Sequence, residues 1–199
     1  MFAKSENMIE VINTWLIRKY LRSCSRLSEF DKERIKYALS VILDEIEKVI
    51  GVLFVFKLLG RLQMFFVSFV VLMSLRVFVG GIHFEKRYQC FMFTLSFFLI
   101  SVFMSEIFII YKTAGFIICC LGLMNIVLCV PLPSKHRILV SERREKRLRN
   151  RAMLVMSIWT ICYIWSNTIV ANLILWTVIV QQHEILYYKM FKQEEKRNE

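Results

Sequence analysis

Residues Leu62–Val79 read LQMFFVSFVVLMSLRVFV, an apolar run whose only charged residue, Arg76, lies near its end. At about 1.5 Å per residue, a helix of this length measures roughly 27 Å, which is close to the thickness of a bilayer's hydrocarbon core. Backbone polar groups inside a bilayer must be hydrogen-bonded internally, and a helix achieves this within one segment. The run therefore predicts a transmembrane helix.

Similar runs fill most of the chain. Tyr37 to Gly60 is polar at first and then apolar, whereas Phe91 to Ile110 and Gly115 to Val130 are apolar throughout. Met153 to Val180 is too long for one span and contains SNTIVAN, so we interpret it as two short spans that turn near Ser166 to Asn172. The pattern predicts an all-α, polytopic integral membrane protein with about six transmembrane helices in three hairpins.

Composition supports this fold class. The chain has 199 residues, 57% of them hydrophobic, with only six Gly and two Pro. This is too apolar for an ordinary soluble domain. The net charge of +11 could indicate nucleic acid binding, but the apolar runs argue against nucleic acid and favour an anionic lipid surface. No CxxC pair occurs among the six cysteines, so we expect no disulfide framework, metal site or cofactor.

Basic residues predict the orientation and the regions of the chain. Of the 27 Lys and Arg residues, 23 fall on one side of the six-span arrangement, three (Lys57, Arg61 and Lys112) fall on the other, and Lys48 lies near the boundary. The positive-inside rule then places both termini in the cytoplasm of a bacterial cell. The predicted regions are an amphipathic interfacial region at 1–36, a membrane domain at 37–188 with cytoplasmic loops at 76–90 and 131–151, and a charged tail at 189–199.

One segment carries residues suited to catalysis. Arg76 to Cys90 reads RVFVGGIHFEKRYQC, with His83 and Cys90 seven positions apart. A cysteine thiolate can attack a peptide carbonyl if an imidazole removes its proton. A straight helix would separate the two by about 10 Å, so the chain must bend, and Gly80 and Gly81 permit a bend. The first turn of the next helix could also supply amides for an oxyanion. From the spacing alone, the non-catalytic interpretation is favoured, with His83 as an interfacial residue, Cys90 as a small apolar residue that enters a span, and the glycines as a turn.

This segment resembles the signature of the accessory gene regulator B (AgrB) family of bacterial membrane cysteine endopeptidases. A second likeness is the PLPSK motif at Pro131 to Lys135, before the basic loop. The resemblance implies that Cys90 is the nucleophile and His83 its base. The same resemblance implies that the site is supported, or the substrate bound, by Arg76, Gly80, Gly81 and Lys135. Glu85 stands where the family commonly has a small residue.

The resemblance also implies a substrate and partners. Family members cleave the C-terminal part from a precursor peptide, AgrD, through a thioester on the cysteine, which leads to a cyclic autoinducing peptide for quorum sensing. We therefore expect an AgrD-like precursor as a partner. Membrane lipids are expected from the basic loops, and a homodimer from the small interfaces and short spans, with which the resemblance is compatible. The alternative is a non-enzymatic membrane transporter or assembly partner in which the GGIH segment is only a re-entrant turn. The sequence leaves the precursor and its ring size open.

Overall fold

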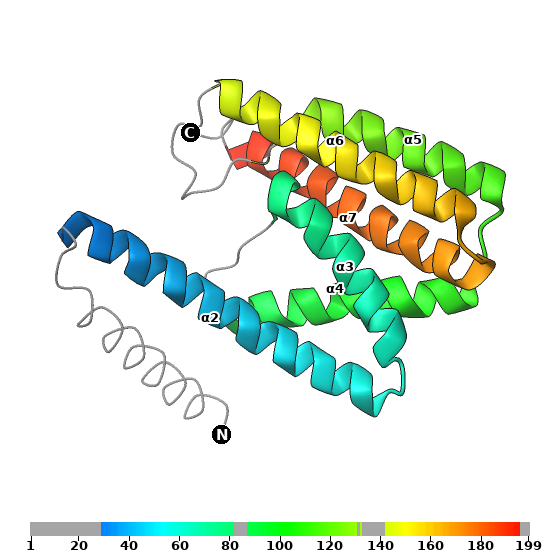
Figure 1. The fold of residues 1–199 in the computed structure, drawn as a ribbon, viewed down its shortest axis with the longest axis horizontal. Helices are drawn as coiled ribbons and strands as arrows, with labels where there is room; N and C mark the ends of the chain where they lie inside the picture. Colours follow the sequence, from blue (N-terminus) through cyan, green and yellow to red (C-terminus); the bar gives the residue numbers. More distant parts are fainter. Residues whose placement is uncertain (1–28, 82–86, 131, 133–141, 196–199) are drawn as a thin grey trace. The chain divides into compact units, whose positions relative to one another are not determined.

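The computed structural model of the chain describes residues 29–81, 87–130, 132 and 142–195. Six helices account for nearly all of these residues, and no strand occurs among them. They are α2 (Glu29–Leu58), α3 (Leu62–Val79), α4 (Arg87–Ile107), α5 (Lys112–Cys129), α6 (Glu142–Trp165) and α7 (Thr168–Glu195) (Figure 1). The predicted interfacial helices before residue 29 lie outside the described residues. The all-α prediction is confirmed.

Four of the described helices are long and apolar enough to cross a membrane, which makes this a polytopic membrane protein. They are α3, α4, α5 and the Thr168–Met190 part of α7. Helices α2 and α6 occupy the positions of the other two predicted spans, but each combines a charged half with an apolar half. That these two helices also cross the membrane stays a prediction.

The basic segment 131–151 is not a loop throughout, because α6 already begins at Glu142. Residues 142–151 read ERREKRLRNR, and Glu, Arg, Lys and Leu are all strong helix formers. Glu142 and Glu145 also lie in the first turn, where negative charge stabilises the helix dipole. Similarly, α7 continues through most of the predicted charged tail, to Glu195.

The described chain divides into two compact units, Met1–Val55 and Phe56–Glu199. Helix α2 passes through residue 36, where the sequence predicted a change from an interfacial to a membrane region, and continues across the boundary between the two units. The second unit contains α3 to α7 and is called the bundle below. All residues discussed as the candidate site belong to it.

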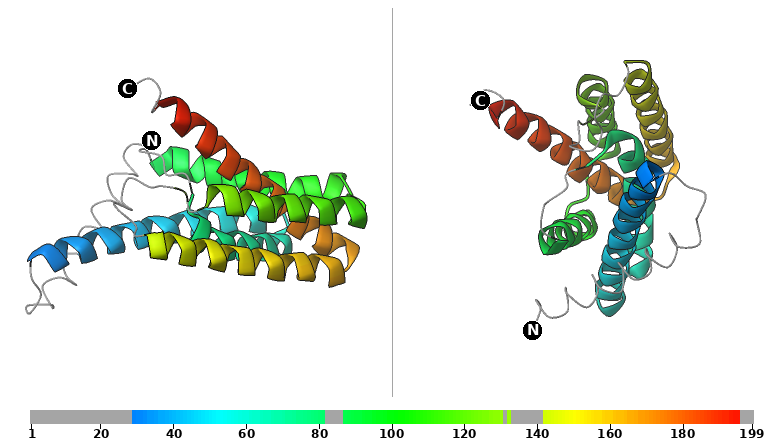
Figure 2. Two further views of the ribbon diagram at one scale, coloured as in Figure 1. Left: turned by 90° about the horizontal axis from the view of Figure 1, so that it is seen from above. Right: turned by 90° about the vertical axis from the view of Figure 1, so that its left-hand side faces the viewer.

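Helix α7 is the centre of the bundle. It contacts α3, α4, α5 and α6, and it lies between α4 on one side and α5 and α6 on the other (Figure 2). Its buried face bears Leu175, Val178 and Ile185, which are fully enclosed. Because α7 must meet helices on several sides, it is also the most enclosed of the four apolar helices.

Two hydrogen-bonded contacts fix the direction of α3 relative to α7. The Ser68 and Thr177 hydroxyls are 2.8 Å apart, and the Arg76 guanidinium lies 3.2 Å from the Glu184 carboxylate. Later residues of α3 thus meet later residues of α7, so the two helices run parallel. A serine–threonine hydrogen bond of this kind stabilises helix packing where the surroundings are apolar.

Helix α5 packs through small side chains. Three of its four buried residues, Gly115, Cys119 and Gly122, are small, and the fourth is Ile126. Other large residues, such as Phe116 and Leu128, are exposed. Small residues at this spacing let neighbouring backbones approach closely inside a membrane. The exposed face is entirely apolar near the middle of α5, as expected for a surface that faces lipid.

The bundle has two ends with different chemistry. At one end, called the Glu106 end, Arg61 precedes α3 and forms an ion pair of 2.6 Å with Glu106 of α4. The side chain of Asn172 also lies there and donates to the Ser105 and Phe108 carbonyls near the end of α4. At the opposite end, called the Cys90 end, α3 finishes and α4 begins. The candidate site is at the Cys90 end.

Candidate functional site

The glycine pair predicted to bend the chain ends α3. Gly80 has φ of 92°, and its N–H donates to the Arg76 carbonyl at 2.9 Å. A side chain would be strained at this φ, whereas glycine adopts it at low cost. Gly80 therefore terminates the helix directly before the segment that carries His83.

Gly81 is required for a different reason, which is space. A Cβ atom placed on Gly81 would lie 2.7 Å from Nη2 and 2.8 Å from Cζ of Arg76. These separations are far below van der Waals contact, and the neighbouring atoms belong to a charged group. The backbone at Gly81 thus rests directly on the Arg76 guanidinium, five residues earlier in the chain.

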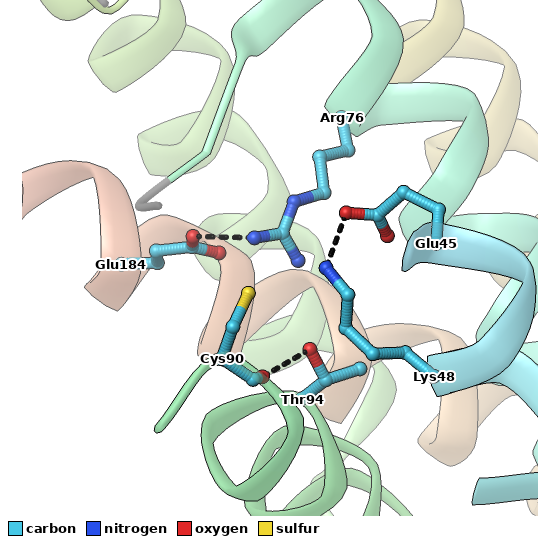
Figure 3. A network of polar contacts seen from close by, with 6 residues as sticks. All are labelled: Glu45, Lys48, Arg76, Cys90, Thr94 and Glu184. Atoms are coloured by element: carbon cyan, nitrogen blue, oxygen red, sulfur yellow. Dashed lines mark hydrogen bonds and ion pairs between the residues drawn. The ribbon is translucent and has the colours of Figure 1, made fainter. Parts of the chain in front are cut away.

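Arg76 is held by a residue that the sequence analysis did not identify. Its Nη2 donates to Oε1 of Glu184 on α7 at 3.2 Å, and the Glu184 side chain is only 1% exposed while that of Arg76 is 16% exposed (Figure 3). The sequence does contain one signal for Glu184. Thr177, Gln181 and Glu184 are spaced so that they lie on the same face of a helix, which marks a polar stripe on an otherwise apolar helix. The partner could not be predicted, since 108 residues separate the two.

Cys90 lies in the first turn of α4. It is 8% exposed, and its carbonyl accepts a hydrogen bond of 2.9 Å from the Thr94 hydroxyl. In Figure 3 the Cys90 side chain points from α4 toward the Arg76–Glu184 pair. Amides in the first turn of a helix have no partner within the helix and can bind an anion. The thiol is therefore close to a helix N-terminus and directed toward a cation.

The connection between α5 and α6 also reaches this end of the bundle. The N–H of Leu132 donates to the Val79 carbonyl at 3.0 Å, and the Leu132 side chain is buried. Leu132 is the second residue of the PLPSK motif, so the start of that motif lies beside the end of α3. Lys135 lies outside the described residues.

The structure therefore brings four predicted or implied features together: Arg76, Gly80, Gly81 and Cys90. It adds Glu184 and Leu132 to them. His83 falls in 82–86, outside the described residues, so the predicted contact between His83 and Cys90 stays a prediction. The connection that contains it begins at Gly81 and ends at Arg87, which opens the α4 turn that holds Cys90.

The remaining cysteines in the described residues lie elsewhere. Cys119 is buried in the α5 interface, Cys120 is exposed, and Cys129 and Cys162 are partly buried. Cys90 is thus distinguished from the others by its surroundings.

Comparison with known proteins adds independent information. The family described as accessory gene regulator B matches residues 10–185 of the chain. A protein from Clostridium beijerinckii named as AgrB-like is 26% identical over 180 residues, which cover 90% of this chain and 89% of that protein. No solved structure is detectably similar. The likeness therefore extends over nearly the whole chain and includes every element of the candidate site.

Proposed function

The chain belongs to the accessory gene regulator B family, and from this premise we propose that it is a membrane cysteine endopeptidase. Its substrate is an AgrD-like precursor peptide, from which it removes the C-terminal part. Cys90 is the nucleophile and His83 is the general base. The product after further steps is a cyclic autoinducing peptide for quorum sensing.

One observation supports this proposal best. Cys90 occupies the first turn of α4 and is directed toward Arg76, in a place that no other described cysteine shares. A reactive cysteine needs access to a base and a site that can hold negative charge on the substrate oxygen. The helix N-terminus and the nearby guanidinium provide positive potential there. His83 lies in the connection between Gly81 and Arg87 and would supply the base.

The proposed chemistry proceeds in two displacements. His83 removes the proton from Cys90, and the sulfur attacks the carbonyl carbon of the scissile peptide bond. The C–N bond breaks, the proton passes from His83 to the leaving amine, and the C-terminal fragment departs. The N-terminal fragment remains as a thioester on Cys90. A thiol of that fragment then attacks the thioester, which forms a thiolactone and restores the Cys90 thiol.

The site would face the cytoplasm. The Cys90 end of the bundle also carries the basic first half of α6, including Arg143, Arg147 and Arg151, whereas the Glu106 end carries Arg61 and Lys112. Basic residues concentrate on the cytoplasmic side of membrane proteins. The precursor would therefore reach the enzyme from the inner surface of the membrane.

The test is co-expression with the precursor encoded in the same operon, followed by mass spectrometry of the peptides. Cys90→Ala and His83→Ala should abolish cleavage while the protein remains in the membrane, and Cys90→Ser should lose most activity because a hydroxyl is a weaker nucleophile. Cys120→Ala is the matched control, since Cys120 is exposed on α5 and should be dispensable. Full cleavage by Cys90→Ala would refute the mechanism.

A transporter or assembly role is the alternative, and polar residues in mid-bundle would favour it. The Ser68 and Thr177 hydroxyls in the α3–α7 interface are buried but bonded to each other. Such a pair stabilises helix packing. It therefore provides no specific support for a transport pathway.

A further inference from the structure

Two ionised groups in the apolar bundle need an explanation. Removing charges from water is costly, and a buried ion pair often contributes less stability than apolar residues of the same size. Glu184 is 1% exposed on a helix apolar enough to cross a membrane, and its partner Arg76 is largely enclosed. Charged residues inside membrane-spanning helices are rare, and they commonly belong to a functional site.

The geometry at Arg76 shows what the pair can do. Glu184 holds the Nη2 side of the guanidinium, and the Gly81 backbone rests against Nη2 and Cζ. Arg76 also accepts the Gly80 N–H through its own carbonyl. A residue fixed in this way cannot move freely toward a substrate carboxylate. It can, however, fix the backbone that leads out of α3.

We propose that Glu184 is a positioning residue that acts through Arg76. By holding the guanidinium under Gly81, it sets the direction in which the chain leaves α3 toward the segment that carries His83 and returns to Cys90. The consequence for catalysis rests on the proposed endopeptidase function. The structural effect on the Gly80–Gly81 backbone does not.

The proposal differs from the idea that Arg76 binds a substrate carboxylate, and the two predict different kinetics. A positioning role predicts that Glu184→Gln lowers kcat by about a hundredfold and leaves KM nearly unchanged, because small misplacement of catalytic groups slows chemistry strongly. A carboxylate-binding role for Arg76 predicts that KM changes instead. Glu184→Asp should have a higher kcat than Glu184→Gln, because it keeps the carboxylate charge on a side chain that is one methylene group shorter.

The bundle contains a matched control. Arg61 and Glu106 form a shorter ion pair at the opposite end, where their side chains are 45% and 25% exposed. Glu106→Gln removes a charge of the same type from an ion pair that has no contact with Gly81. We expect this variant to cleave like the wild type.

Removing one partner of a buried pair can unfold a protein, so a second variant is required. Arg76→Met combined with Glu184→Met removes both charges and keeps apolar volume, which preserves folding in such cases. Gly81→Ala provides a third route, because its Cβ would displace the same guanidinium. All three changes should produce the same loss of kcat, and combining Gly81→Ala with Glu184→Gln should add little to it.

The deciding measurement is hydrogen–deuterium exchange of the full-length protein in detergent micelles, with cleavage assayed in parallel. In Glu184→Gln and in the double Met variant, the amides of residues 77–81 and 87–90 should lose protection relative to wild type and to Glu106→Gln. Unchanged protection in both variants would overturn the inference, as would a rise in KM without a fall in kcat. If the wild type does not cleave the precursor, the proposed function fails, while the exchange result still decides the positioning role.

Discussion

Gly115 offers the sharpest test of how the bundle is packed. A Cβ atom there would lie 2.5 Å from Cζ of Tyr163 and 2.9 Å from Cδ2 of Leu175, so Gly115→Ala would force α5 away from both α6 and α7 or displace these two side chains. The Tyr163 ring is buried and its hydroxyl donates to the Lys112 carbonyl at 3.3 Å, which prevents it from turning aside.

The magnitude follows from two opposing effects. Overpacking of a well-packed interior costs about 1–3 kcal/mol, and replacing Gly by Ala inside a helix returns about 1 kcal/mol of helix propensity. Because atoms of the Tyr163 ring must move, we take the cost of the overlap as about 3 kcal/mol. After the gain of about 1 kcal/mol in helix propensity, the free energy of unfolding should fall by about 2 kcal/mol.

Gly122→Ala is the matched control on the same helix. Its Cβ would approach Cε of Met156 at 3.1 Å, and the end of a methionine side chain is flexible. The overlap cost is then about 1 kcal/mol or less, so this variant should be close to neutral once helix propensity is included.

The assay is unfolding of the full-length protein in mixed micelles, with increasing SDS and circular dichroism as the readout. Tyr163→Phe should partly rescue Gly115→Ala, because it removes the oxygen nearest to the new methyl group, although alone it loses a hydrogen bond worth about 1 kcal/mol. Equal losses from the two alanine variants, or no rescue, would refute the described α5–α6–α7 contact.

Four further outcomes are expected. Asn172→Leu should lower stability in the same unfolding assay by about 2–3 kcal/mol, because it removes the bonds to the Ser105 and Phe108 carbonyls and to the Ile110 N–H. Gln181→Leu should raise stability by about 1–3 kcal/mol, because neither of its buried amide atoms has a partner among the described residues; a loss would contradict this. Reporters fused after Tyr188 and within 131–151 should both be cytoplasmic, and a signal from outside would reverse the orientation. Cross-linking in native membranes should give a dimer, and a monomer alone would exclude it.

Sequence alone predicted the helices because hydropathy and bilayer thickness constrain them strongly. Leu62–Val79 was predicted and found with the same bounds, and the turn near Ser166 was correct because SNTIVAN interrupts an apolar run. Helix ends in charged segments were missed. Residues 142–151 contain helix formers and nothing that breaks a helix, so α6 starts ten residues before its apolar part.

The site could be predicted only where chemistry is local. Gly80 was identified because a bend after a helix requires a residue that tolerates positive φ, and Cys90 because it follows His83 by seven positions in a segment that resembles the family signature. Glu184 could not be found in this way. Its role depends on the parallel packing of α3 and α7, and helix α7 continues four residues beyond the predicted end of its span before reaching it.

The turn between α6 and α7 has a consequence for biogenesis. Only Ser166 and Asn167 separate the two helices, and the Asn167 side chain caps α7 by accepting the Val170 N–H at 2.9 Å. The apolar part of α6, from Ala152 to Trp165, extends about 21 Å and is short for a segment that must leave the translocon alone. Because the connection has only two residues, α6 cannot move far into the lipid before the start of α7 has also left the translocon. If α6 crosses the membrane as the sequence predicts, the two helices must therefore enter the bilayer together, as a hairpin in which the strongly apolar α7 helps α6 to insert.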